Sequence, residues 1–222
     1  MGMQHLPAGS GAANLAPQCS AGTKTEIKER QMIYETIITS VDAQNRVHIA
    51  PFGIREHEGQ VIIAPFRPSA TLDNLLANRC AIVNLVDDVR IFAGALTGHN
   101  EWPFHPAIKV KGFVLDAALA HRELELTDIR EDATRPQLYF KVVHEEMHTP
   151  FRGFNRAQAA VIELAILVSR LHMLPPEKIE TEMAYLQVAI DKTAGEHEQQ
   201  AWSWLSEKIE NHKAAVAGSN LA

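Results

Sequence analysis

A short polar segment between two apolar runs carries the residue types that bind phosphate. It contains Arg67, Ser69, Thr71 and Asn74, and it leads into a predicted short helix that begins near Thr71. Arg67 offers a planar fork of N–H donors, the hydroxyls add further polar groups, and the first turn of a helix has unpaired backbone N–H groups. Together these groups can hold an anion such as phosphate. A simpler interpretation from composition alone is a connection in which Arg67 is solvated and the hydroxyls only cap the helix.

The residues around this segment resemble a known superfamily. The chain reads V-H-I-A-P-F-G-I from Val47, then Q-V-I-I-A-P-F-R-P-S-A-T-L-D-N-L-L from Gln60, then C-A-I-V-N-L from Cys80. This succession resembles the flavin-reductase-like FMN-binding split barrels, and residues 32–170 resemble more narrowly the domain-of-unknown-function family 447 (DUF447). The spacing alone predicts only an anion, whereas the resemblance implies that the ligand is FMN.

The resemblance also implies roles for individual residues. The polar segment would hold the FMN phosphate, with Thr71 and Asn74 at the family's positions, and the strand from His48 to Gly53 would lay its backbone along the isoalloxazine ring. Asn84 would either reach the flavin or satisfy a carbonyl of the barrel. The implied cofactor-binding residues are His48, Ala50, Pro51, Phe52, Gly53, Arg67, Ser69, Thr71, Asn74, Asn84 and Arg152.

Residues 144–148 read H-E-E-M-H, the letter pattern of a zinc-protease helix. The preceding residues 138–143 are rich in β-branched and aromatic types, and Thr149-Pro150 leaves no room for the helix that such a motif needs. We therefore expect a polar strand end or loop here. No metal site is predicted, because the sequence gives no support to a metal shared between these histidines and those of the preceding loop.

Residues 151–157 read F-R-G-F-N-R-A and form a second cluster of basic and aromatic side chains. Arg152 and Arg156 could contact a phosphate or an anionic substrate, with Phe154 stacked on a ring. The alternative is that Asn155 caps a helix while the phenylalanines pack against the barrel and the arginines pair with carboxylates. The resemblance extends through this cluster and favours a role for Arg152 in the site.

The bulk properties exclude several classes of protein. The chain has 222 residues, of which 46% are hydrophobic, so it can bury a substantial core. Its formal charge of −6 argues against nucleic-acid binding, and no apolar run reaches the ~20 residues of a membrane helix. No signal peptide is evident, and Cys19 and Cys80 are poorly placed for a disulfide, so we expect a cytoplasmic protein.

Alternating apolar residues and turn signals predict strands up to residue 144, and helical spacing follows. The strands are expected at 32–41, 46–54, 61–64, 81–85, 108–115, 120–129 and 137–144. The stretch that contains Gly94 and Gly98 is expected to be irregular. After a cap at Asn155, one helix carries apolar positions 161, 164, 165 and 168, a second begins at Pro176, and a third covers 199–213.

The predicted fold class is mainly β with α: an antiparallel, Greek-key-like, FMN-binding split β-barrel with a C-terminal helical segment. The expected parts are a disordered tail at 1–30, the barrel at 31–152, the helical segment at 153–213 and a frayed end at 214–222. The resemblance further implies a homodimer with FMN at the subunit interface.

The expected function is that of an FMN-dependent oxidoreductase acting on a small planar or anionic substrate. No catalytic residue can be named, and the chain has no G-x-G-x-x-G nicotinamide fingerprint. A rival of another class is a non-catalytic flavin carrier or sensor whose helices recruit a protein. A third interpretation keeps the barrel but replaces FMN with haem or a deazaflavin.

Overall fold

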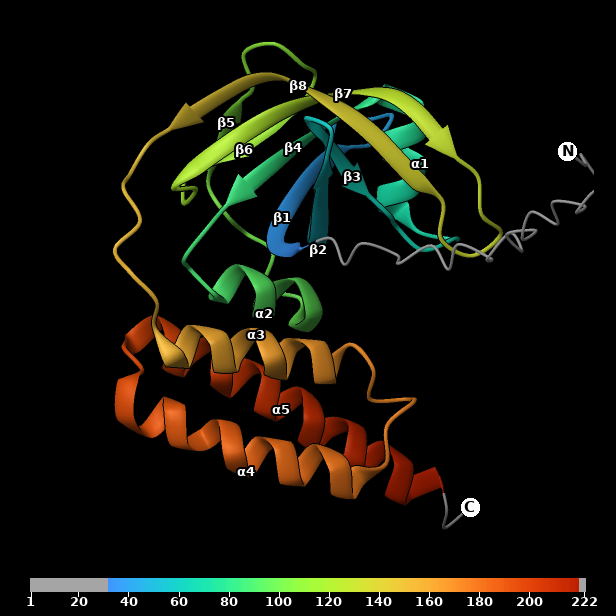
Figure 1. Ribbon diagram of the computed structural model, residues 1–222. Helices are drawn as coiled ribbons and strands as arrows, with labels where there is room; N and C mark the ends of the chain where they lie inside the picture. The colour runs from blue at the N-terminus through green and yellow to red at the C-terminus, as the bar shows by residue number, and fades with distance from the viewer. Residues whose placement is uncertain (1–31, 220–222) are drawn as a thin grey trace, which may run out of the picture. The chain divides into compact units, whose positions relative to one another are not determined.

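The computed structural model describes residues 32–219, which form a β-barrel followed by a helical bundle (Figure 1). The predicted tail at 1–30, Cys19 and the last three residues lie outside the described residues. Six strands close the barrel in the order β1-β2-β3-β8-β7-β4, and every neighbouring pair is antiparallel. The predicted fold, a split barrel with C-terminal helices, is confirmed.

Strand periodicity explains how these segments build the barrel, because alternate side chains point into it. Its core consists of apolar side chains such as Ile38, Ile54, Val83, Leu124 and Phe140. The barrel strands are β1 (Ile33–Val41), β2 (Val47–His57), β3 (Gln60–Ile63), β4 (Cys80–Leu85), β7 (Ala120–Arg130) and β8 (Gln137–Met147). A separate two-stranded sheet is formed by β5 (Phe104–Pro106) and β6 (Phe113–Leu115).

The barrel is split where β2 and β3 diverge. β2 pairs with β1 from Val47 to Arg55, but its register with β3 covers only Arg55–His57. Helix α1 (Ala70–Asn78) packs into the opening and buries Leu72 and Leu75 in the barrel core. Within the described residues, the edge of β2 from 47 to 54 that faces away from β1 therefore has no strand partner.

Four further helices follow, and α2 joins the barrel to the bundle (Figure 1). Ile91 and Phe92 of α2 pack on the outer face of β1 and β2, whereas Ala93 lies in the core that α3, α4 and α5 share. This short helix is thus buried on two sides, by the barrel on one and by the helical bundle on the other. The bounds are α2 (Arg90–Thr97), α3 (Arg156–Val168), α4 (Pro176–Thr193) and α5 (Glu196–Ser219).

Helix α2 shows that the expected irregular stretch was wrong. Gly94 lowers its helix propensity by about 1 kcal/mol, but burial against two layers outweighs that cost. The strand expected at 108–115 is only β6, because the loop before it turns its N–H groups toward Glu123. The last helix is longer than the expected 199–213. The cap at Asn155 is confirmed, since its side chain accepts hydrogen bonds from the N–H groups of Ala157 and Gln158.

We predict that Gly94→Ala destabilises the protein by about 2 kcal/mol, measured as the free energy of unfolding in urea. A Cβ at this position would lie 2.3 Å from the backbone oxygen of His99, which cannot rotate away. The matched control is Gly195→Ala, whose Cβ would meet only a side-chain oxygen of Glu198 at 3.0 Å. We expect the control to stay within about 0.5 kcal/mol of the wild type, and equal losses in both variants would contradict this packing.

Candidate functional site

The predicted phosphate segment lies at the N-terminus of α1. Ser69 is the N-cap residue, and its hydroxyl accepts a hydrogen bond from the N–H of Leu72 at 3.3 Å. Its carbonyl accepts the N–H of Asp73. Arg67 is 44% exposed and reaches Glu131 with an N–O distance of 3.2 Å, an interaction that solvent weakens. Ser69 therefore caps α1, and the same segment also presents the exposed Arg67 side chain that an anion could contact.

Thr71 connects α1 to the unpaired edge of β2. Its side chain is buried, and Thr71 Oγ1 lies 3.1 Å from His48 Nε2. Burial lowers the pKa of the half-buried His48, so its imidazole is favoured in the neutral form. The structure thus brings together His48, Ser69 and Thr71, which the sequence predicted as parts of one site.

The strand that the resemblance places along the flavin ring is the first half of β2. Residues 50–53 are half-buried, and Pro51 suits an open edge because it has no N–H to donate. Gly53 has no room for a side chain, since a Cβ there would lie 2.6 Å from Ile33 Cγ2 and 3.3 Å from Glu35 Oε1. Glu35 is the residue of β1 that pairs with Gly53, and its pKa is raised by burial first and then by repulsion from Glu163.

The two asparagines of the predicted set are committed to internal hydrogen bonds. Asn74 is buried and donates to Ser40 Oγ at 3.1 Å. Asn84 is fully buried, donates to the carbonyl of Ile37 and to Thr39 Oγ1, and accepts the N–H of Leu115 at 2.9 Å. Of the two interpretations left open for Asn84, the structure shows the amide that satisfies barrel groups.

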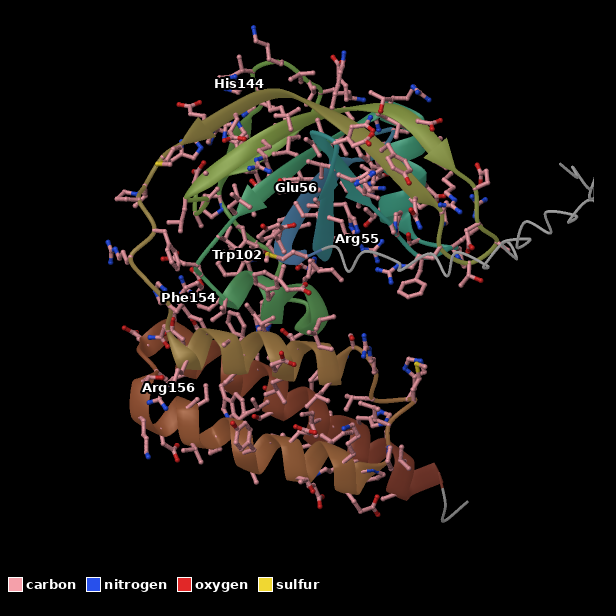
Figure 2. All side chains as sticks on the ribbon, viewed as in Figure 1. Arg55, Glu56, Trp102, His144, Phe154 and Arg156 are labelled. Atoms are coloured by element: carbon pink, nitrogen blue, oxygen red, sulfur yellow. The ribbon has the colours of Figure 1, made fainter. Side chains whose placement is uncertain are left out.

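Arg152 does not lie with the phosphate segment. It lines a cavity of about 550 Å³ together with Asp87, Asp88 and the helical residues Gln158 and His197. The nearby Phe154 is fully exposed and marks the link between β8 and α3 (Figure 2). The structure therefore separates Arg152 from the other predicted residues by placing it where the barrel meets the bundle.

A larger cavity of about 650 Å³ lies at the end of the barrel opposite α1. Tyr34, Ile54 and Phe151 are among its lining residues. Arg122 also lines it, but this guanidinium is already paired with Glu56 at 2.5 Å and Glu145 at 2.7 Å. The cavity therefore offers apolar contacts without a free positive charge.

Sequence reasoning missed a buried polar cluster on the outer face of β7. Glu123 is fully buried, and its carboxylate accepts the N–H groups of Ile108, Lys109 and Val110 at 2.6–2.9 Å. Burial disfavours the charge of Glu123, but these hydrogen bonds outweigh it and lower its pKa. The available signal was the H-x-E spacing of His121 and Glu123, which places both side chains on one face of a strand.

Comparisons with known proteins agree with this architecture. Residues 34–149 match the family model described as "Protein of unknown function (DUF447) N-terminal domain", and residues 155–207 match the model described as "Protein of unknown function (DUF447)". The uncharacterized protein MJ1453 of Methanocaldococcus jannaschii is 26% identical over 148 residues, which cover 63% of this chain and 75% of that protein.

Two solved structures are similar to this chain, and the first of them shares its fold. The FMN-bound protein MM1853 of Methanosarcina mazei, described under DUF447, has a TM-score of 0.69 and 21% identity, covering 81% of this chain and 96% of that chain. The NADH:FAD oxidoreductase SgcE6 of Streptomyces globisporus has a TM-score of 0.45 and 12% identity, covering 55% of this chain and 80% of that chain.

We predict that Glu123→Gln lowers the free energy of unfolding at pH 7 by about 3 kcal/mol, because an amide cannot accept three N–H groups as a carboxylate does. Urea denaturation followed by circular dichroism measures the loss. The control is Glu125→Gln on the same strand, where the carboxylate is 46% exposed and pairs with Lys141. A change within about 1 kcal/mol is expected for the control, and a Glu123 variant as stable as the wild type would refute the assigned role.

Proposed function

The chain belongs to the family of unknown function DUF447, and from this premise we propose that its barrel binds FMN. The phosphate lies at the start of α1 and the ring lies along the open edge of β2. The observation that carries the proposal is the position of that unpaired backbone edge directly beside a helix N-terminus. The FMN bound to MM1853, which shares this fold over 96% of its own chain, supports the same ligand here.

The donors at α1 suit a phosphate. Ser69 takes up the N–H groups of Leu72 and Asp73, which leaves the N–H groups of Ala70 and Thr71 for a ligand. The Ser69 hydroxyl acts as an acceptor toward Leu72, so its own proton remains available to a phosphate oxygen. Arg67 adds a positive charge, because its ion pair with Glu131 is open to solvent and can be exchanged.

The open edge of β2 suits the polar rim of a flavin ring. In an antiparallel pair every second residue directs its N–H and C=O groups away from the partner strand. Between residues 47 and 54 of β2 these groups meet no other strand of the described part of the chain. Fixed backbone dipoles of this kind orient the ring and tune its electron affinity, while FMN itself supplies transfer of a hydride or of single electrons. Residues His48 to Gly53 therefore hold and orient the cofactor.

We further propose that the protein is an oxidoreductase acting on a small planar or anionic substrate. A non-catalytic flavin carrier or sensor is the rival, with the barrel at 31–152 as the flavin module and the helices at 153–213 as an interaction module. The two family matches, at 34–149 and 155–207, support this division. None of the described helices is both long and apolar enough to span a membrane.

A second copy of the chain completes the proposed site. Several large apolar side chains of the barrel domain are exposed, an arrangement typical of surfaces that become covered by a partner. They include Ile33, Tyr34, Phe66, Phe104 and Met147. A homodimer with FMN at its interface would cover part of this surface, and light scattering on the purified protein measures the mass directly.

We predict that Arg67→Ala weakens FMN binding by about tenfold, because a charge-assisted contact to the phosphate contributes ~1.5 kcal/mol or more. Flavin fluorescence titration of the apoprotein measures the dissociation constant. Arg170→Ala, an exposed arginine beyond the end of α3, is the charge-matched control and should bind FMN as the wild type does. Equal affinities in wild type and Arg67→Ala would move the phosphate away from this segment.

We predict that NADH or NADPH bleaches the visible absorption of the bound flavin under anaerobic conditions, as expected for an oxidoreductase. Spectra recorded with and without each nucleotide provide the measurement. Chemical reduction by dithionite is the control that shows the flavin to be accessible to electrons. A flavin that dithionite reduces while both nucleotides leave it oxidised would favour the carrier or sensor.

A further inference from the structure

Histidines and glutamates occupy alternate positions on the paired strands β7 and β8, at the start of β7 and the end of β8. His144 and Glu146 lie two residues apart on β8, and His121 and Glu123 lie two apart on β7. The register pairs Glu123 with His144 and His121 with Glu146, so all four side chains share one face. In the H-E-E-M-H sequence, His144 and Glu146 thus lie on one face because side chains alternate along a strand, and no helix is needed to bring them together.

Two ring nitrogens of this cluster, one on each of its two histidines, lack a hydrogen-bond partner among the described residues. Nε2 of His121 and Nε2 of His144 are buried and make no hydrogen bond. The side chain of His121 is only 1% exposed, and its Nε2 lies 3.5 Å from Glu123 Oε1. His144 Nε2 lies 3.6 Å from Glu146 Oε2. Because a buried polar atom without a partner is destabilising and rare in native structures, two such atoms in one cluster call for a ligand.

We propose that His121, His144 and Glu146 bind a divalent transition-metal ion of the zinc class. Their ligand atoms all lie within 4.8 Å of one another. Ligand atoms around a tetrahedral zinc ion are about 3.4 Å apart, so rotation of the partly exposed His144 and Glu146 side chains closes the site. Two imidazole ligands favour zinc or a similar ion over magnesium and calcium, which prefer oxygen.

A neighbouring histidine orients the buried ligand. His121 Nδ1 lies 2.9 Å from His148 Nε2, and the two rings stack with centroids 5.0 Å apart. When Nε2 of His121 binds the metal, its Nδ1–H donates to His148, the arrangement by which proteins fix the orientation of a ligating imidazole. Farther out, His105 Nδ1 lies 2.7 Å from Asp116 Oδ1, and the His105 ring meets that of His148 edge to face.

The site has an open side. Three protein ligands leave a coordination position for water or a substrate, as in catalytic rather than structural zinc sites. Glu146 is 47% exposed and His144 is 25% exposed, so the ion is reachable from solvent. His144 lies on the part of the barrel that faces away from the helical bundle (Figure 2). The proposed metal ligands are not shared with the flavin site, so each proposal stands or falls separately.

Cobalt titration of the tag-free, chelator-treated full-length protein tests the site, because Co²⁺ replaces Zn²⁺ and its visible absorption reports the ligand geometry. We expect one Co²⁺ per chain, displaced by Zn²⁺. The variants His144→Ala and Glu146→Gln should each bind at least about tenfold more weakly. Both positions are partly exposed, so the variants are expected to fold, which circular dichroism checks.

The matched control is His57→Ala, an exposed histidine of the same barrel that lies at the end of β2. It should bind Co²⁺ with wild-type affinity and an unchanged spectrum. Two results would overturn the proposal: a wild-type protein that takes up no Co²⁺, or folded His144→Ala protein that binds it as the wild type does. Flavin content measured on the same samples reports on the FMN proposal independently.

Discussion

The divergence of β2 from β3 is the constraint on which the other features of the barrel depend. Only Arg55–His57 of β2 pair with β3, so the barrel would stay open along the rest of β2 without α1. The apolar face of α1 fills this opening with Leu72 and Leu75, and Thr71 meets His48 across the gap. The divergence of these two strands thus leaves the backbone edge of β2 unpaired and allows the N-terminus of α1 to lie beside it. The proposed flavin site follows from that pair of features.

A second constraint is the burial of Glu123 on the outer face of β7. Its carboxylate takes the N–H groups of the loop before β6, and this prevents the loop from extending as a strand. The same loop packs Ala107 and Val110 against Ile82 of β4 and Val114 of β6. The charge that organises this loop also lies beside the proposed metal ligands, since Glu123 Oε1 is 3.5 Å from His121 Nε2.

The sequence predicted the barrel well because strand alternation and turns are local signals. The short helix that begins near Thr71 and the cap at Asn155 both depend on residues close together in the sequence. Helix α2 could not be predicted from local signals. Its burial on two sides offsets the low helix propensity of Gly94, and that burial depends on segments remote in the sequence. The internal bonds of Asn84 and the distance of Arg152 from α1 likewise depend on packing between remote segments. The proposed metal ligands were missed because H-E-E-M-H was weighed as a zinc-protease helix and as a partner of the loop histidines, but not across the paired strands β7 and β8.

The most direct test of the central claim, that this barrel binds FMN, is an absorption spectrum of the purified protein followed by the mass of the released chromophore. The account predicts a flavin spectrum and the mass of FMN, either as purified or after addition of FMN and removal of the excess. A protein that remains colourless after that treatment would contradict the account. A haem or deazaflavin chromophore would contradict it as well, although the barrel would remain.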